Sequence, residues 1–185
     1  EWKKEAKKRG LNNFSTTPEA LDAYVSKNTL NLFERNGIMN HREQEARHAI
    51  YLETYTKKIQ IESRVMGDLA MNHIIPTAIR YQKMLVDNVS GLKNILSGSE
   101  FNKVAMPQLE VIKEISEHIA VIKQNVDEMI EARKKANAIE DHRKHALAYC
   151  HEVKEHFETI RYHVDKLELI VDDESWPLPK YRELL

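Results

Sequence analysis

The chain has 185 residues and a formal net charge of −1, with hydrophobic residues at 42% and charged residues at 31%. With only 5 Gly and 5 Pro, this composition is typical of proteins built from long helices. The near-zero charge argues against nucleic acid or anionic lipid as partners, and no apolar run has the length of a membrane span. A single cysteine fits a reducing compartment. We therefore expect an all-α, cytoplasmic protein that binds neither nucleic acid nor membrane.

Two short helices are predicted first. Thr17 is the expected N-cap of the first helix, and Pro18 takes its first position, where the missing N–H does no harm. The second helix runs to Asn36, and Gly37 suits the left-handed conformation that ends many helices. The chain also begins EWKKEAKK, without an initiator Met. We therefore expect it to be part of a longer protein.

A long helix is predicted to begin at Asn40 and to end before Ser97. Asn40 and Glu43 have the spacing of a capping box, and Gly67 and Pro76 are the breakers within the range. About 56 residues at 1.5 Å each would span roughly 84 Å. Because Pro76 lacks an N–H and crowds the preceding turn, we predict a kink there.

Apolar residues recur in steps of three and four along three predicted helices, which is the spacing of a coiled-coil seam. Before Pro76 the apolar residues Ile61, Val65 and Leu69 are out of phase with the first seam. This change of phase indicates that the two halves of the long helix face different neighbours. The seams consist of Met71, Ile75, Ala78, Gln82, Leu85, Val89, Leu92 and Leu96; of Ile112, Ile115, Ile119, Ile122, Val126 and Met129; and of Ala146, Cys150, Val153, Phe157, Ile160, Val164, Leu167 and Val171.

The connections between these helices are short. Residues 97–107 are predicted to form a turn, the helix that follows ends near Asn137, and the last helix continues to about Val171. Short connections favour antiparallel neighbours, so we predict an antiparallel up-down-up bundle of long helices, preceded by the two short ones. Pro177 and Pro179 then favour an extended C-terminal arm.

No pattern in the chain predicts a catalytic, cofactor-binding or metal-binding residue, although there are 9 histidines. His151 and His156 are five apart, about 140° around a helix, and cannot share a zinc ion. Glu45 and His48 form one Glu-x-x-His pair, whereas a di-iron bundle needs two, so a metal-dependent bundle oxidase is the least favoured alternative. Cys150 lies on a seam and is expected to be a small buried hydrophobe. Phosphate-binding glycine loops and a nucleophile elbow are absent from the sequence.

The region around Pro76 is rich in polar residues. Arg64 and Asp68 lie four apart and are candidates for a buried ion pair that fixes helix register, while Asn72 and His73 are candidates to meet the carbonyls freed at the bend. A solvated helix face is the alternative for these residues, and the sequence does not choose between the two. A catalytic role is disfavoured, because no pocket-forming loops surround them.

Several stretches resemble one enzyme family. Residues 16–62 resemble the closing helices of the glutamine synthetase catalytic domain; they read TTPEALDAYVSKNTLNLFERNGIMNHREQEARHAIYLETYTKKIQIE. The C-terminal region of type III glutamine synthetases, found chiefly in Bacteroides-like bacteria, is similar to IQIESRVMGDLAMNHIIPTAIRYQ, KEISEHIA, VDEMIEARKKAN and WPLPKYRELL. The resemblance covers nearly the whole chain.

This resemblance carries expectations about activity and partners. The family makes glutamine from glutamate and ammonia, through a γ-glutamyl phosphate formed from ATP, with Mg²⁺ or Mn²⁺ held by carboxylates. None of the family's metal, ATP or glutamate motifs occurs in this sequence, so no catalytic residue is carried over and the chain alone is expected to be inactive. Family members form hexameric rings that pair into dodecamers. The rest of the parent chain and neighbouring subunits are therefore the expected partners.

The resemblance also implies a division of the chain. Residues 1–62 are expected to close the catalytic domain, and residues 63–185 to form the added C-terminal bundle with its arm. The expected function is a non-catalytic role in assembly or structure, and the alternative is a docking module for a regulatory partner or effector. The arm is expected either to dock on a neighbour or to fold back on its own bundle. It contains Trp176, Pro177, Leu178, Pro179 and Tyr181.

Overall fold

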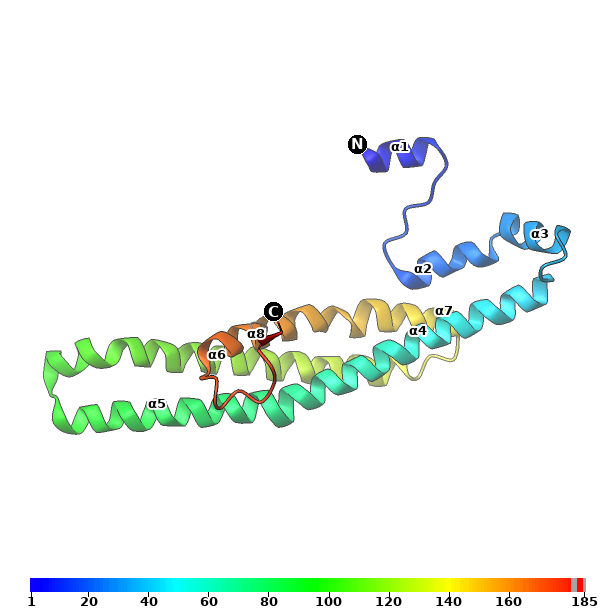
Figure 1. Ribbon diagram of the computed structural model, residues 1–185. Helices are drawn as coiled ribbons and strands as arrows, with labels where there is room; N and C mark the ends of the chain where they lie inside the picture. Colours follow the sequence, from blue (N-terminus) through cyan, green and yellow to red (C-terminus); the bar gives the residue numbers. More distant parts are fainter. Residues whose placement is uncertain (181–182, 185) are drawn as a thin grey trace. The chain divides into compact units, whose positions relative to one another are not determined.

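The computed structural model describes residues 1–180, 183 and 184, and within them it contains helices and no strand. The prediction of an all-α protein is confirmed (Figure 1). The labels α, η1 and η2/η3 denote α-helices, one 3₁₀-helix and two π-helices, respectively. In chain order the elements are α1 (Trp2–Lys8), α2 (Thr17–Asp22), η1 (Ala23–Val25), α3 (Lys27–Arg35), α4 (His41–Leu69), η2 (Ala70–Ile74), α5 (Ile75–Ile95), α6 (Gly98–Ala136), α7 (His142–Ala148), η3 (Tyr149–Val153) and α8 (Glu155–Ile170).

The contacts divide the chain into two compact units. Unit 1 consists of Glu1–Ile61 and Ala132–Lys154; unit 2 consists of Glu62–Glu131 and the chain from Glu155 onward. The break after Ile61 falls one residue from the predicted division. However, unit 1 also contains a segment that the sequence assigned to the bundle, because residues distant in sequence pack against the N-terminal helices. The assignment of residues 1–62 to a catalytic domain stays a prediction.

The N-terminal helices of unit 1 follow local capping rules with one shift. Helix α2 begins at Thr17, so its N-cap is Thr16 and the predicted Thr17 cap is wrong by one residue. The Thr16 hydroxyl donates to the Glu19 carboxylate at 2.7 Å, which ties down the first turn. Pro18 takes the second position of α2 rather than the predicted first, and it still lies in the first turn. Gly37, after α3, has φ of +64°, which confirms the left-handed helix end.

The long helix begins at the predicted capping box. The Asn40 N–H donates to Glu43 Oε2 at 2.8 Å, and the Glu43 N–H donates to Asn40 Oδ1 at 2.9 Å, which confirms this start. The chain then stays helical through α4, η2 and α5. The π-helical turn of η2 lies immediately before Pro76, which occupies the first turn of α5. A local widening of the helix is one way to accommodate a ring that crowds the turn before it.

The buried face of α4 differs from the predicted one. Ile61 and Val65, which the sequence placed on an apolar stripe, are 61% and 52% exposed. That part of the prediction is wrong. The buried positions instead follow a three-four pattern in which small and polar residues alternate with large apolar ones, and hydrophobic periodicity gives such residues little weight. They include Leu52, Thr56, Ile59 and Ser63, and the polar Gln44 in the first turns of α4 is buried as well.

Gly67 lies on the same inward side of α4, in unit 2. A methyl group at this position would lie 3.7 Å from Met129 Cε and 3.7 Å from Val126 Cγ1, which is ordinary van der Waals contact. We expect Gly67→Ala to raise the free energy of unfolding by about 0.5–1 kcal/mol, because alanine restricts the unfolded chain and favours helix. Gly91→Ala, with nothing within 4 Å, is the matched control in denaturant titrations. If Gly67→Ala lowers the free energy of unfolding while Gly91→Ala raises it, the contact of the added methyl group with Met129 and Val126 is not an ordinary one.

Within unit 2, α5 and α6 are joined by hydrogen bonds between side chains and backbone. Gln82 Nε2 donates to Ile112 O at 2.8 Å and to Ser116 Oγ at 2.6 Å. Further along, Asn88 Nδ2 donates to Gln108 Oε1 at 2.6 Å. Residue numbers rise on one helix as they fall on the other, so the paired parts of the two helices run antiparallel (Figure 1).

Helices α6 and α8 are joined in the same way. His118 Nδ1 and His163 Nδ1 lie 2.8 Å apart, and His156 Nδ1 lies 3.2 Å from Asn125 Oδ1. These pairs again have an antiparallel order. The apolar core of unit 2 lies between its helices and is made largely of predicted seam residues. The residues with at most 2% exposure in this unit include Ala70, Ile74, Ala78, Ile115, Ile122, Val126, Met129, Ile160, Leu167 and Val171.

The predicted turn at residues 97–107 is too long. Helix α6 begins at Gly98 and contains Pro107 in its interior. Pro107 is exposed, so the carbonyl that it leaves without a helical donor has access to water, and the helix tolerates the proline. The predicted end near Asn137 agrees with the last helical residue, Ala136. The predicted last helix is also interrupted, because η3 separates α7 from α8.

The His118–His163 pair predicts a pH dependence of stability. Burial, and then the nearby His118, lower the pKa of His163 below its usual 6.5. The unfolded chain therefore binds more protons than the folded chain in this range, so the free energy of unfolding falls as the pH drops below 6.5 towards the folded-state pKa. We expect acid titration monitored by denaturant unfolding to show this loss, and His163→Asn to reduce it.

Burial, and then the nearby His142, also lower the pKa of His145, so part of the loss belongs to unit 1 and remains in His163→Asn. The matched control is His151→Asn, which removes an imidazole from an exposed position. If His163→Asn and His151→Asn give the same profile, the histidine pair does not contribute.

Candidate functional site

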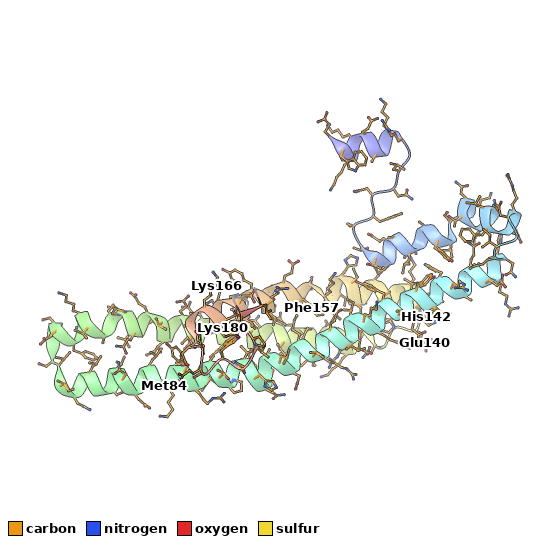
Figure 2. The ribbon with its side chains drawn as sticks, in the orientation of Figure 1. Met84, Glu140, His142, Phe157, Lys166 and Lys180 are labelled. Carbon is orange, nitrogen blue, oxygen red and sulfur yellow. The ribbon has the colours of Figure 1, made fainter. Side chains whose placement is uncertain are left out.

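Unit 1 contains a pocket of about 200 Å³. One wall is formed by α4, through Glu53, Thr56, Lys57 and Gln60. The opposite wall is formed by Glu140, His142 and His145, at the start of α7. Figure 2 labels Glu140 and His142 on this wall. The pocket is smaller than ordinary ligand sites, which measure about 300–1,000 Å³ and are mainly apolar, and its lining is polar and ionisable.

Helix periodicity explains the first wall. The spacing of Glu53, Thr56, Lys57 and Gln60 is i, i+3, i+4, i+7, which places four side chains on one face of a helix. Lys57 Nζ lies 2.7 Å from Glu53 Oε1. This hydrogen bond, together with the charge of Lys57, lowers the pKa of Glu53. Both side chains remain exposed, so the pair is available to a ligand.

A short connection after α6 builds the second wall. Asp141 caps α7 by accepting a hydrogen bond from the Lys144 N–H at 2.8 Å. His142 and His145 are three apart in α7 and therefore share one side of it. The cap fixes where the helix begins and hence where both imidazoles lie.

A hydrogen-bond network ties the two walls together. Tyr149 is fully buried in η3, and its hydroxyl donates to Asn137 Oδ1 at 2.7 Å. Gln60 Nε2 contacts the Tyr149 hydroxyl at 3.2 Å and Asn137 Oδ1 at 3.3 Å. The Tyr149 ring also meets the His145 ring edge-on, with centroids 5.2 Å apart. The network therefore fixes Gln60, a residue of the first wall, to the segments on either side of the second wall.

Two residues of this pocket each have a buried polar atom with no hydrogen-bond partner among the described residues. Thr56 is 5% exposed and its hydroxyl is unpaired. His145 Nε2 is likewise inaccessible and unpaired. Burial, and then the nearby His142, lower the pKa of His145 below its usual 6.5, which favours the neutral imidazole. Buried polar atoms are normally satisfied, so these two atoms are exceptions to that rule, and their lack of accessible surface means that a ligand in the pocket does not reach them.

A second cluster in unit 1 holds α7 against α2. Arg143 forms a two-pronged contact with Asp22, with Nε 2.9 Å from both carboxylate oxygens and Nη2 2.6 Å from Oδ2. His48 Nε2 lies 3.6 Å from the same carboxylate. The Arg143 hydrogen bond is the main reason that the pKa of Asp22 is lowered. This cluster positions α7 and so supports the pocket wall.

The residues around Pro76 do not form a buried pair. Arg64 and Asp68 are both exposed, and Asp68 instead accepts a hydrogen bond from Asn72 Nδ2 at 2.5 Å. His73 is exposed as well. These side chains therefore lie on a solvated helix face, which is the alternative that the sequence left open. The buried side of this helix faces the other way.

The histidines highlighted by their spacing do not assemble into a metal site. Within the part of the chain that the structure describes, no group of three or more His, Cys, Asp or Glu residues is placed to hold a metal ion. His48 lies near Asp22, whereas Glu45 is exposed. His151 is exposed and His156 lies beside Asn125. Cys150 is half-buried rather than fully buried.

The C-terminal arm lies partly on its own unit. Trp176 is 7% exposed and Lys180 is 7% exposed. Of the remaining arm residues, Leu178 is half-buried, and Pro177 and Pro179 are exposed. The predicted Tyr181 contact lies outside the described residues. The structure therefore favours the folded-back alternative for the segment that ends at Lys180.

Sequence reasoning missed every residue of the pocket. One sequence feature pointed to the first wall. The polar residues Glu53, Thr56, Lys57 and Gln60 share one face of α4, and Thr56 also lies in the three-four pattern between Leu52 and Ile59. The His142 and His145 spacing was a second signal. Neither signal identifies a pocket alone, because the two walls come from segments about eighty residues apart that meet only in the folded protein.

Comparisons with known proteins place the chain in a family. The family described as "Glutamine synthetase C-terminal domain" matches residues 1–93, half of the 185-residue chain. Over its full length the chain is 47% identical to glutamine synthetase of Bacteroides fragilis, 32% identical to type-3 glutamine synthetase of Dictyostelium discoideum and 28% identical to glutamine synthetase of Butyrivibrio fibrisolvens.

The chain spans about a quarter of the length of these relatives, at 25%, 25% and 26%. None of the helices in the described part of the chain is long and apolar enough to cross a membrane. The family match covers α1 to α4, η2 and most of α5, and includes the α4 wall of the pocket. The chain belongs to the glutamine synthetase C-terminal domain family.

Proposed function

We propose that this chain is the non-catalytic helical domain of a type III glutamine synthetase and that it serves assembly of the parent enzyme. The parent ligates glutamate and ammonia to glutamine in the cytoplasm, with ATP and Mg²⁺ or Mn²⁺ held outside this chain. The observation that carries the proposal is the full-length similarity to one quarter of three glutamine synthetases. A segment shared as a unit by such relatives is expected to keep the same place in the parent protein.

Exposed apolar residues in unit 1 support a role in assembly. Trp2, Leu11 and Phe14 are 75%, 54% and 46% exposed, on and just after α1. The three side chains lie close together in the sequence, and contiguous apolar patches on a protein surface mark interfaces. We propose that the rest of the parent chain, or a neighbouring subunit of a homo-oligomer, covers them.

The proposal includes an up-down-up bundle for the three long helices, with a kink at Pro76. Its support is the antiparallel order of the hydrogen bonds that join α5 to α6 and α6 to α8. The π-helical turn before Pro76 supports the kink. A bundle with few loops offers a rigid support for a larger enzyme.

Two measurements test this function. The isolated chain, mixed with glutamate, ammonia, ATP and Mg²⁺, is expected to form no glutamine, and turnover in a clean preparation would contradict the proposal. In the parent enzyme, Trp2→Ser with Phe14→Ser is expected to reduce the fraction of assembled oligomer measured by light scattering. Val65→Ser, at a 52% exposed position in unit 2, is the control. If the double variant assembles as the unaltered parent enzyme does, the exposed apolar residues around α1 do not form a subunit interface.

The alternative function is a docking module for a regulatory partner or effector, and the pocket on α4 and α7 favours it. In this case a bound effector is expected to change glutamine formation by the parent enzyme without altering its oligomeric state. Thermal-shift screening of the chain, followed by activity assays of the parent, distinguishes this alternative from a purely structural role.

A further inference from the structure

We propose that the outer part of the α5–α6 hairpin pairs with the same part of a second copy of this chain. This part, the tip, consists of residues 81–111 and includes the end of α5, the turn and the start of α6. The inference concerns unit 2 alone and does not depend on the proposed place in the parent enzyme. It rests on a face of the tip that continues an existing helix interface, on the charge of that face and on its size.

The tip extends beyond the third helix of unit 2. Helix α8 packs on α6 through the contacts of His163 with His118 and of His156 with Asn125, and it also touches η2, which precedes α5. Figure 1 shows α5 and α6 continuing as a pair past the end of α8. The two helices therefore have each other as neighbours in the tip, whereas a third helix covers them in the rest of the unit.

One stripe of α6 is buried beside α8 and open in the tip. Its positions follow steps of three and four, so they share one side of the helix. In the part that α8 covers, Ile115 and Ile122 are 0% exposed, whereas Val104, at the tip end of the same stripe, is 44% exposed. The tip therefore continues the surface on which α8 packs. The stripe consists of Val104, Gln108, Val111, Ile115, His118, Ile122, Asn125 and Met129.

A matching stripe runs along α5. Thr77, at its start, is 0% exposed, whereas Met84 and Ile95, in the tip, are 59% and 82% exposed. The hydrogen bond from Asn88 to Gln108 joins the two stripes and places them on the same side of the hairpin. The tip residues of both stripes are called the open face below. The α5 stripe consists of Thr77, Tyr81, Met84, Asn88, Gly91 and Ile95.

The charges of the tip favour an identical copy as the partner. No residue of the open face is charged, and Asp87, at its edge, is paired with Lys83. A strongly charged partner gains little from such a surface, whereas an identical copy is not repelled by it. Around the open face the tip has three lysines and three acidic residues, so its charges balance; they are Lys83, Asp87, Lys93, Glu100, Lys103 and Glu110.

The size of the open face predicts a weak pair. Residues 81–95 of α5 span about 22 Å, and two adjacent helices are about 20 Å wide. Each tip thus offers an outline of about 400 Å², and a pair of tips about 800 Å², which is below the roughly 1,200 Å² of a stable interface. Pairing about a two-fold axis turns two hairpins into a four-helix bundle in which both open faces are covered. We expect a dimer with a Kd of about 0.1 mM.

The experiment uses the 185-residue chain at concentrations from about 0.01 to 1 mM, on either side of the expected Kd. Sedimentation measures the oligomeric state, and NMR of the methionine methyl groups identifies the surface that pairs. Met84 lies on the open face, whereas Met106, 50% exposed, lies about 200° around α6 from Val104. The Met84 signal is expected to shift as the concentration rises and the Met106 signal to stay in place, because the pair covers the open face.

Matched variants place a carboxylate on the open face or away from it. Met84→Glu brings one negative charge from each copy into the pair and is expected to weaken the dimer at least about tenfold. Val86→Glu is the control, because Val86 is 43% exposed and lies about 200° around α5 from Met84. This control is expected to pair as the wild type does. Both substituted positions are exposed, so both variants are expected to fold, which circular dichroism at low concentration checks.

Three results would overturn the proposal. The first is a chain that stays monomeric over the whole concentration range; if Met84 is then protected in the parent enzyme, another part of that enzyme covers the open face. The second is a shift of the Met106 signal without a shift of the Met84 signal. The third is a Met84→Glu variant that dimerises as Val86→Glu does.

The test also separates the open face from the interface proposed for assembly. A dimer formed through the exposed apolar residues around α1 leaves the Met84 signal in place and survives Met84→Glu. Such a dimer is lost in the variant with Trp2→Ser and Phe14→Ser, whereas a dimer of tips is retained in it. Failure of one interface therefore leaves the other proposal standing.

Discussion

Ile122→Ala is expected to lower the free energy of unfolding by about 2–5 kcal/mol, the usual range for removing a large aliphatic side chain from a core. Ile122 lies in α6, is 0% exposed and occupies a position of the predicted seam. Its neighbours along that seam, Val126 and Met129, are each 1% exposed. The loss combines the transfer free energy of the removed atoms with the cavity that rigid helices cannot close. Urea titration followed by circular dichroism measures it.

Ile95→Ala provides the matched control for this substitution. Ile95 ends α5 in the same unit and is 82% exposed. The same atoms are removed there, yet little apolar surface returns to water, so the change is expected to stay within about 0.5 kcal/mol. Equal losses for the two variants would mean that the α6 seam is not a packed core in solution.

Lys180→Met is expected to destabilise unit 2 by about 1.5–3 kcal/mol, the range for lost hydrogen bonds of a charged group. Lys180 Nζ donates to Glu168 O at 2.7 Å and to Val171 O at 2.8 Å. Glu168 lies in the last turn of α8 and Val171 directly follows the helix, where a cation also complements the helix dipole. Nζ lies 2.7 Å from Asp173 Oδ1 as well. Figure 2 labels Lys180 beside α8.

Methionine retains the apolar part of the side chain, so the comparison isolates the ammonium group. Lys113→Met, at an exposed position of α6, is the control and is expected to change stability by less than about 0.5 kcal/mol. Thermal and urea unfolding of both variants measure the difference. Hydrogen exchange of the amides near the end of α8 is also expected to accelerate in Lys180→Met alone. If neither variant changes stability, the arm does not stabilise α8.

Local rules predicted the beginnings and ends of several helices. The capping box at Asn40 and the left-handed Gly37 depend on residues a few positions apart, so the sequence contains all the information that they require. The one shift, from Thr17 to Thr16 at the N-cap, is within the usual uncertainty of helix boundaries. Pro107 was different, because a proline's effect depends on whether the carbonyl it frees can reach water, which is a tertiary property.

The candidate site depended on long-range contacts that no local pattern contains. The α4 wall was readable as a polar face, but the sequence could not indicate that residues 140–145 lie opposite it. The same limit explains the wrong stripe at Ile61 and Val65. A helix buries whichever face its neighbours cover, and Thr56 and Ser63 were covered although they are polar.

The sequence by itself determined the all-α class, the long helices with their seams on α5, α6 and α8, and the family. These properties follow from periodicity along one helix and from similarity, both of which are visible in a linear chain. Only the tertiary structure decided the grouping of residues 132–154 with the N-terminal helices, the buried face of α4, the Lys180 contact and the pocket. Each of these depends on which segments meet in space, and that is decided by the burial of whole faces rather than by neighbouring residues.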